Sequence, residues 1–285
     1  MSFPAIPYYA RRLAGLQNVH DRVHARLLAC DAIRIDRRWN VANVRSSFWR
    51  LYFNNIDGAS VKLDSGSYAL GGGRVHFIPA WVHFSCRCVR PVNHLYIHFE
   101  LMGLPGPVSR QVFDKPFTLP PSPLVEQVAA RLAGEAIRPE PNDMGIALLA
   151  KSTVYLALGV LLEQAHAGLL KRLNHATDRT TAVWPALNYI ELHYDRPLRA
   201  ETLADLCGLS TDHFVRRFRE AVGQTPARYV AQHRTSRAAQ ELIFGNDRIE
   251  DVAEQCGFPN RFYFTRVFKR HLGLTPAAYR RQTRV

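Results

Sequence analysis

The sequence predicts an α+β chain of more than one domain, with short β-strands in its first half and only helices at its C-terminal end. Between residues 32 and 120, short alternating runs of apolar and polar residues are separated by glycines and prolines, which is typical of a β-sandwich or small barrel. Residues 198–281 contain one helical segment written twice. At 285 residues and 47% hydrophobic composition, the chain has enough apolar material for two cores.

The strands of the first half are expected at four places in particular. These are residues 50–53, 61–63, 74–78 and 95–99, with turns at Gly58, Gly66, 71–73, Pro79 and Pro91 between them. Residues 1–120 are therefore expected to form one domain built on a small barrel or sandwich.

The middle of the chain is predicted to be helical and to hold a dimer interface. Residues 146–162 are apolar nearly all round, but this segment is shorter than a membrane span and contains Lys151. One face is expected to pack on its own domain and the other on a second subunit. The expected stripe consists of Ile146, Leu149, Leu156 and Val160. We assign residues 121–173 to this helical dimerisation segment and the polar, aperiodic residues 174–182 to a linker.

The C-terminal region, residues 183–285, contains an internal duplication. Ala204, Cys207 and Gly208 return 49 positions later as Ala253, Cys256 and Gly257. After one inserted residue the offset becomes 50, and the matching pairs are Phe214 and Phe264, Arg216 and Arg266, Phe218 and Phe268, Gly223 and Gly273, Thr225 and Thr275, Pro226 and Pro276, and Tyr229 and Tyr279. Two copies are too few for a solenoid, so the repeat indicates a domain of two similar units.

Each copy has the pattern of a helix, a glycine and a second helix. The first helix stops at Gly208 or Gly257, and Ser210 or Asn260 is placed to cap the next helix. The two phenylalanines of each second helix are four residues apart and share one buried face. Residues 198–222 and 247–272 are thus predicted to be two helix-turn-helix motifs.

The second helix of each copy is basic outside its buried face, which favours a nucleic-acid partner over a merely solvated surface. In the helix-turn-helix docking mode this helix enters the major groove, where arginine bonds a guanine edge at two points. Arg216 and Arg266, at equivalent positions, are the predicted base-reading residues. The predicted DNA-binding set is completed by Thr211, Asp212, Val215, Asn260, Arg261 and Thr265.

The run ADLCGLSTDHFVRRFREAVGQTPARYV, followed by VAEQCGFPNRFYFTRVFKRHLGLTPAAYR, resembles the DNA-binding domain of AraC/XylS-type transcription regulators. The resemblance implies two helix-turn-helix units joined by a long helix, here residues 226–244, which contain no glycine and no proline after Pro226. It also implies double-stranded promoter DNA as a partner, and RNA polymerase as another if the protein activates transcription.

A second, weaker resemblance concerns the first domain. The runs SYALGGGRVHFIPAWVHFSC and NHLYIHFE are similar to the cupin-like sensory domain of the same family. This implies a jelly-roll barrel that binds a small-molecule effector at Asn55, His83, His94 and Tyr96. His94, Tyr96 and His98 alternate and share one strand face, whereas His76 is out of step and is expected to point outward. The alternative is that these polar residues bond only one another or solvent.

Composition and motifs indicate no catalytic site, cofactor or metal. No histidine lies between His24 and His76, so the early HxH pair of metal-binding cupins is missing. The main alternative is a cupin-type metal enzyme fused to a DNA-binding tail. The other is a DNA-repair protein, which would need a zinc-binding cysteine cluster.

The charge and cysteine content fit a DNA-binding protein of the cytoplasm. Residues 183–285 contain 16 Lys and Arg against 11 Asp and Glu, a net +5 out of the chain's +13. The remaining +8 lies in the first 182 residues, so charge alone does not locate the DNA-binding half. Five cysteines with no pairing framework and no signal-like N-terminus predict the reducing environment of the cytoplasm. Together with the apolar middle helices and the two resemblances, this leads us to expect a homodimeric, ligand-sensing regulator.

Overall fold

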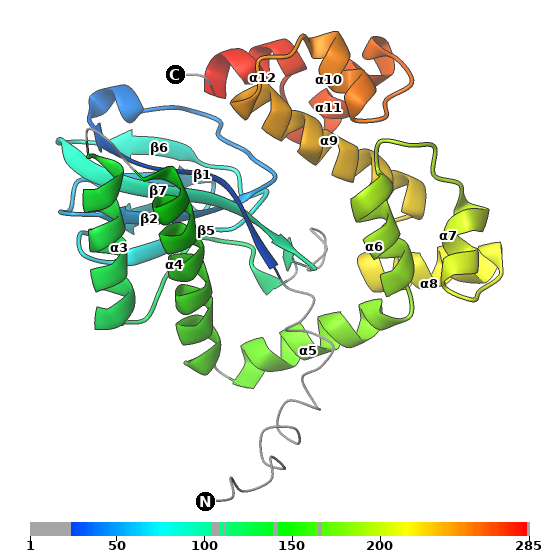
Figure 1. The fold of residues 1–285 in the computed structure, drawn as a ribbon, viewed down its shortest axis with the longest axis horizontal. Helices are drawn as coiled ribbons and strands as arrows, with labels where there is room; N and C mark the ends of the chain where they lie inside the picture. The colour runs from blue at the N-terminus through cyan, green and yellow to red at the C-terminus, as the bar shows by residue number, and fades with distance from the viewer. Residues whose placement is uncertain (1–23, 104–108, 111, 139–141, 165–166, 284–285) are drawn as a thin grey trace, which may run out of the picture.

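The computed structural model describes residues 24–103, 109–110, 112–138, 142–164 and 167–283. The N-terminal part consists of two antiparallel sheets covered on one side by helices, and the C-terminal part is wholly helical (Figure 1). The predicted α+β class and two-part architecture are confirmed.

The larger sheet has five strands in the order β1, β7, β2, β5, β8, and every neighbouring pair is antiparallel. These strands are β1 (His24–Ile35), β2 (Trp49–Asn54), β5 (Val75–Ile78), β7 (Val92–Met102) and β8 (Phe117–Thr118). β7 lies between β1 and β2 in the sheet. As in any strand, its successive side chains point to opposite sides of the sheet.

The smaller sheet has the order β4, β3, β6 and faces the larger one. It is formed by β3 (Ala59–Leu63), β4 (Gly66–Leu70) and β6 (Ser85–Cys88), and the short helix η1 (Arg37–Trp39) lies beside β6. An apolar cluster between the sheets includes Ile35, Val61, Ile78 and Phe84. All four predicted strand segments fall in these sheets, although the third begins one residue later than expected.

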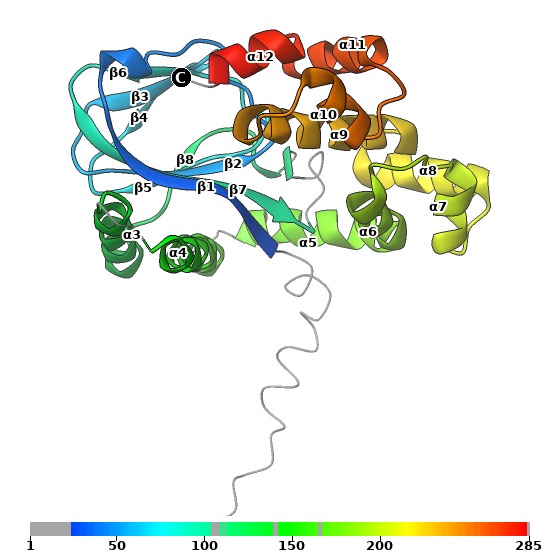
Figure 2. The same ribbon diagram turned by 45° about the horizontal axis from the view of Figure 1, so that its top comes forward.

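Two helices cover the outer face of the five-stranded sheet (Figure 2). They are α3 (Pro123–Ala136) and α4 (Asp143–Glu163). Val125 and Ala129 of α3 and Val154 of α4 are fully buried in the same apolar cluster as Leu51 and Ile97 of the sheet. This packing accounts for the odd-numbered, apolar positions of β7.

The exposed apolar face of α4 differs from the predicted stripe. Ile146, Leu149, Leu156 and Val160 are partly buried and pack against the protein's own core, so the predicted stripe is only partly exposed for contact with a second subunit. Met144, Leu148 and Leu162 are exposed instead. By length and composition alone α4 could cross a membrane, contrary to the expectation that this segment is too short. Its contacts with β1 and α3 place it on the sheet.

The predicted linker is largely helical. α5 (Ala167–Thr181) covers most of residues 174–182 and runs between the two parts of the chain (Figure 1). The Arg179 guanidinium donates to the backbone carbonyl of Glu220, and α5 packs against α8. Such tertiary contacts stabilise a polar helix that the local sequence alone would not predict.

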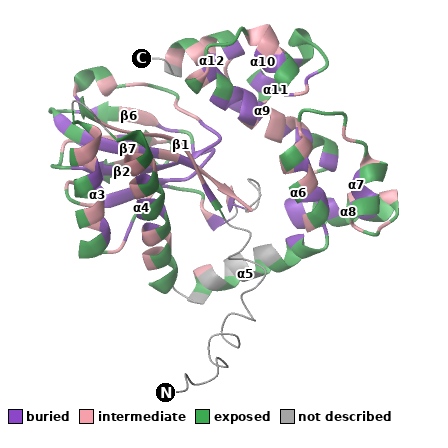
Figure 3. Ribbon diagram, in the orientation of Figure 1, coloured by how far each residue is buried: buried purple, intermediate pink, exposed green. Residues whose placement is uncertain are grey.

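The C-terminal part contains seven helices within the described residues. They are α6 (Trp184–His193), α7 (Ala200–Leu206), α8 (Thr211–Val222), α9 (Pro226–Phe244), α10 (Ile249–Gln255), α11 (Arg261–Leu272) and α12 (Pro276–Thr283). The long helix has the predicted bounds, and much of it is buried (Figure 3). Its N-terminal half packs with α6–α8 and its C-terminal half with α10–α12.

Candidate nucleic-acid interface and effector site

The two helix-turn-helix units have the same internal geometry. In the first, the ring centroids of Phe214 and Phe218 lie 5.5 Å apart, and Tyr229 lies 5.6 Å from Phe218. In the second, the equivalent distances are 5.4 Å between Phe264 and Phe268 and 5.3 Å between Phe268 and Tyr279. The phenylalanines are fully buried. Each recognition helix is therefore held by one aromatic triad, and its opposite face is left toward solvent.

The turns between the helices depend on glycine in both units. Gly208 and Gly257 adopt positive φ values of 65° and 75°, which other residues disfavour. Asn260 caps α11 by accepting from the Tyr263 backbone N–H at 2.8 Å. Ser210 forms no equivalent side-chain bond, so the expected cap of α8 is absent.

The predicted base-reading arginines lie on the outer faces of the recognition helices. Arg216 and Arg266 are exposed, and no acidic side chain in the described part of the chain is within ion-pair distance of either one. The Arg266 guanidinium lies 5.4 Å from the ring centroid of Tyr263, which restricts its direction. Arg216 has no such support.

The other residues of the predicted DNA-binding set differ in how exposed they are to a DNA partner. On α8, Asp212 is exposed, whereas Thr211 and Val215 are partly buried. On the second unit, Thr265 is partly buried. Arg261 is exposed but pairs with Glu250, and the Asn260 side-chain oxygen already serves as the helix cap. A DNA contact by Arg261 would have to compete with this ion pair.

Phe262 is a candidate contact that the sequence reasoning did not find. It lies in the first turn of α11 and is 87% exposed, an unusual position for a large apolar side chain. Phe264 and Phe268 define the buried face of α11. Phe262 lies two residues before Phe264 and therefore off that face, which could have indicated from the sequence that it is exposed. Phenylalanine can contact the methyl group of thymine in the major groove.

The spacing of the two units is set by α9 and by one loop. The Arg234 guanidinium of α9 donates to the carbonyls of Tyr194 and Arg196, both at 2.7 Å. Gly257 of the second unit approaches the same loop so closely that an added Cβ would lie 2.7 Å from the Asp195 carbonyl oxygen. These contacts hold the second unit against the segment that follows α6.

The predicted effector residues are spread between the inside and the outside of the N-terminal domain. His94 is buried and Tyr96 partly buried on the inner side of β7, whereas Asn55 and His83 are exposed. Asn55 is tied to the neighbouring strand end, since its side chain accepts from the Asn93 backbone N–H at 2.9 Å. The structure thus brings together only His94 and Tyr96, whose ring centroids are 6.3 Å apart.

Hydrogen bonds define the state of His94. Asn54 donates its amide N–H to the Leu70 carbonyl, so its side-chain oxygen accepts from His94 Nδ1 at 2.7 Å. Burial lowers the pKa of His94 to about 3, which keeps the ring neutral. A neutral ring that donates through Nδ1 has an acceptor at Nε2.

His76 does not point outward as expected. It is buried, its Nδ1 lies 3.2 Å from the Tyr68 hydroxyl and 3.1 Å from Thr118, and its Nε2 lies 3.0 Å from the Gly71 carbonyl oxygen. The residue is inside because the facing sheet and β8 cover it. Among the described residues there is no group of three or more histidines, cysteines or carboxylates that could hold a metal ion.

A cavity of about 160 Å³ lies between the N-terminal and C-terminal parts of the protein. Its walls include the aromatic rings of Trp49, Trp81, Trp184 and Tyr229. Glu191 and His233 contribute polar groups, and burial lowers the pKa of His233 to about 4. No sequence signal predicted this cavity, because its walls come from segments far apart in the chain.

The C-terminal region is similar to known proteins. Residues 203–282 match the family described as helix-turn-helix domain. The MmsAB operon regulatory protein of Pseudomonas aeruginosa is 33% identical over 96 residues, which are 34% of this chain and 31% of that protein. The bifunctional transcriptional activator/DNA repair enzyme AdaA of Bacillus subtilis is 36% identical over 97 residues, 34% of this chain and 46% of AdaA. The chain thus matches only 31% to 46% of the length of these relatives.

The fold of nearly the whole chain is also found in a solved structure. ToxT from Vibrio cholerae aligns with a TM-score of 0.53 and 12% identity, covering 90% of this chain and 97% of ToxT. At this identity the likeness concerns the fold alone. The C-terminal third of this chain therefore contains two helix-turn-helix units and matches the helix-turn-helix domain family, and nearly the whole chain shares the two-domain fold of ToxT.

Proposed function

We propose that this protein is a sequence-specific transcription regulator that binds double-stranded promoter DNA through both helix-turn-helix units. The observation that carries the proposal is the pair of matched recognition helices, each with one exposed arginine at the same position opposite a buried aromatic triad. The units would enter successive major grooves, about 34 Å apart along the duplex.

In-vitro selection of binding sites tests this proposal with three variants. Arg216→Ala and Arg266→Ala should each cost about 1 to 3 kcal/mol and relax base preference at opposite ends of the site. Arg217→Ala is the matched control, because Arg217 is exposed on the same helix as Arg216 and lies 3.5 Å from Glu220. It should weaken all sequences about equally and leave the motif unchanged. If both arginine variants select the wild-type motif, the assigned reading residues are wrong.

The protein is proposed to act as a homodimer in the cytoplasm. The exposed apolar residues Met144, Leu148 and Leu162 of α4 support a contact with a second copy, because such residues are spaced along one helix face. If the protein activates transcription, RNA polymerase is a further partner.

A small-molecule effector is proposed to bind inside the N-terminal domain at His94 and Tyr96, with Asn55 and His83 at the periphery. Convergent polar and aromatic groups support this site. The cavity between the two parts of the protein is the competing location. ToxT has been crystallised with an unsaturated fatty acid bound. In this chain, however, the cavity is lined by Glu100 and Glu191, which already pair with Arg26 and Arg237, so these arginines are not free to bind a carboxylate ligand.

A thermal-shift screen of sugars, amino acids and aromatic acids separates the two locations. A ligand at 100 times its dissociation constant should stabilise the fold by roughly 2.7 kcal/mol. Tyr96→Phe removes a hydroxyl from the barrel interior, and Asn188→Ala removes an exposed amide from the wall of the cavity. The variant that weakens the shift identifies the site. An enzyme of the cupin type would instead contain metal, which elemental analysis of the purified protein detects.

A further inference from the structure

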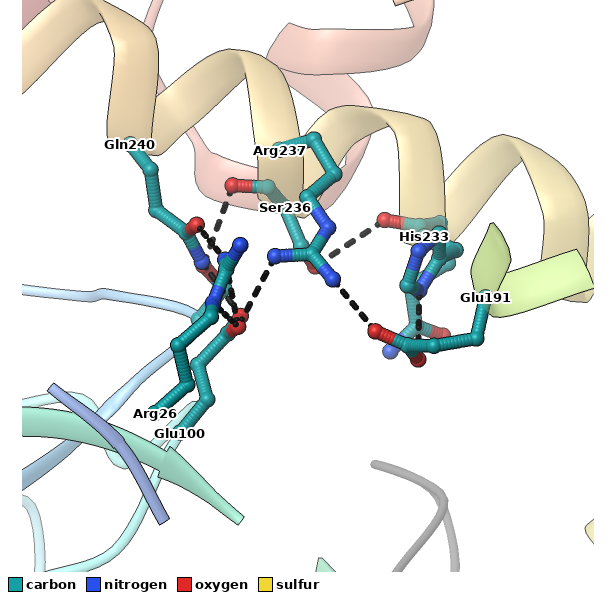
Figure 4. A network of polar contacts seen from close by, with 9 residues as sticks. Arg26, Glu100, Glu191, His233, Ser236, Arg237 and Gln240 are labelled. Carbon is teal, nitrogen blue, oxygen red and sulfur yellow. Dashed lines mark hydrogen bonds and ion pairs between the residues drawn. The ribbon is translucent and has the colours of Figure 1, made fainter. Parts of the chain in front are cut away.

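The end of strand β7 is bonded to the helix that joins the two helix-turn-helix units (Figure 4). Glu100, near the C-terminal end of β7, accepts through Oε2 from Arg26 Nη2 at 2.7 Å and from Arg237 Nη1 at 3.0 Å. Its Oε1 accepts from the Gln240 side-chain amide. Arg237 and Gln240 belong to α9, so one carboxylate of the N-terminal domain holds two successive turns of that helix.

The same arginine also reaches the first helix of the C-terminal domain. Arg237 Nη2 donates to Glu191 of α6, and His233 Nδ1 lies 3.8 Å from the other oxygen of Glu191. Arg237 is only 5% exposed. With Arg26 and Arg237 facing Glu100 and Glu191, the cluster is electrically balanced. Removing one member of such a buried set leaves a charge without its partner.

Glu100 is in phase with the residues that line the interior of the barrel. His94, Tyr96, His98 and Glu100 occupy alternate positions of β7, whereas Leu95, Ile97 and Phe99 pack toward α3 and α4. The inner rings form a continuous row, with centroids 6.3 Å apart for His94 and Tyr96 and 4.7 Å apart for Tyr96 and His98. The inner face of β7 thus ends at the Glu100 carboxylate, which contacts α9.

A second, aromatic connection runs from the barrel to the same helix. The ring centroid of Phe48 lies 4.9 Å from that of His98 and 6.1 Å from that of Phe244, the last residue of α9. One polar and one aromatic contact therefore join the barrel interior to two places on α9. Because α9 packs against both helix-turn-helix units, a displacement of α9 changes their relative position.

We propose that β7 couples the interior of the barrel to DNA binding, with Glu100 as the positioning residue that transmits the position of the strand to α9. The inference rests on the proposed DNA-binding function. Coupling between two sites is reciprocal in binding free energy, so DNA changes the affinity of the barrel for its ligand by the same factor as the ligand changes the affinity for DNA. We therefore expect DNA binding alone to change the local stability of β7, which hydrogen exchange can measure without the ligand.

The test is amide hydrogen exchange of the full chain, with and without the duplex obtained by in-vitro selection. In the wild type, DNA should change the exchange rate of residues 95–99 by at least about five-fold, the lower end of coupling between sites. Glu100→Gln and Phe244→Ala should each reduce this change, and the double variant should abolish it. Glu126→Gln is the matched control, since Glu126 pairs with Arg74 within the N-terminal domain, 3.3 Å away, and not with α9. It should respond like the wild type.

The outcomes separate the coupling from the proposed function. If the wild type binds DNA but residues 95–99 exchange unchanged, the coupling is wrong and the function stands. If Glu100→Gln and the double variant respond like the wild type, Glu100 does not transmit the signal. If the wild type selects no DNA sequence, both proposals fall. Phe244 is 43% exposed, so Phe244→Ala provides a variant expected to fold even if Glu100→Gln is destabilised.

Discussion

The two turn glycines should respond differently to the same substitution, although they occupy equivalent places in the repeat. Both have positive φ, so alanine at either position costs about 1 to 2 kcal/mol of backbone strain. At Gly208 no heavy atom lies within 4 Å of the added Cβ. At Gly257 the Cβ would meet Asp195 O at 2.7 Å, Asp195 C at 2.9 Å and Tyr194 O at 2.9 Å, all of them backbone atoms.

The backbone must therefore move in Gly257→Ala but not in Gly208→Ala. Relieving such a contact adds about 1 to 3 kcal/mol, the usual cost of overpacking. We expect Gly208→Ala to lose about 1 to 2 kcal/mol of unfolding free energy, and Gly257→Ala about 2 to 5 kcal/mol. Urea unfolding of the full chain, followed by far-ultraviolet circular dichroism and compared at equal m-values, measures the difference.

The same pair of variants separates stability from DNA reading. The loop that Gly257 approaches is also held by Arg234 of α9, so its displacement alters how the two units are spaced. Gly257→Ala should weaken binding to the complete site more than binding to either half-site, whereas Gly208→Ala should not discriminate. Equal losses of unfolding free energy in the two variants would show that the close approach at Gly257 does not constrain the fold.

Three further substitutions test the recognition helix, the buried histidine and the apolar helix. Phe262→Ala should change the unfolding free energy by no more than about 0.5 kcal/mol, because Phe262 is 87% exposed, yet weaken DNA binding; Phe264→Ala, in the core of the same helix, should cost about 3 to 5 kcal/mol. His233 stays neutral in the folded protein down to a pKa of about 4, while its unfolded form has the ordinary value of 6.5, so its stabilisation is complete above pH 6.5 and is lost as the pH falls toward 4. Between pH 7 and pH 5 the unfolding free energy should thus drop by about 2 kcal/mol less in His233→Gln than in the wild type, and equal drops would contradict the buried neutral state. Leu148→Glu, at an exposed position of α4, should convert the proposed dimer to monomer in sedimentation at micromolar concentration without loss of fold, whereas a wild type that is already monomeric under these conditions would refute the dimer.

Local sequence patterns were enough to predict the C-terminal domain. The duplication aligned Phe214 with Phe264 and Gly208 with Gly257, and these pairs occupy the same places in the structure. The long helix that the family resemblance implied, residues 226–244, has the same bounds in the structure. Strand alternation likewise placed His94, Tyr96 and His98 on one face of β7.

What covers each face depended on contacts between distant segments. His76 is buried because β8 and Tyr68 close over it, and His83 is exposed because no element does. Because α4 is apolar on all sides, its sequence did not indicate which residues face the sheet. The polar composition of residues 174–182 did not predict a helix there, since that helix is stabilised by its contact with α8.

The amino-acid sequence by itself determined the repeated helices, the strand phase and the exposed arginines, because each depends on neighbours within a few residues. Only the tertiary structure determined the bonds of Glu100 to Arg237 and Gln240, which lie 137 and 140 residues away, and the approach of Gly257 to Asp195. Periodicity specifies which side chains share a face, but the partner of that face is chosen by the packing of the whole chain.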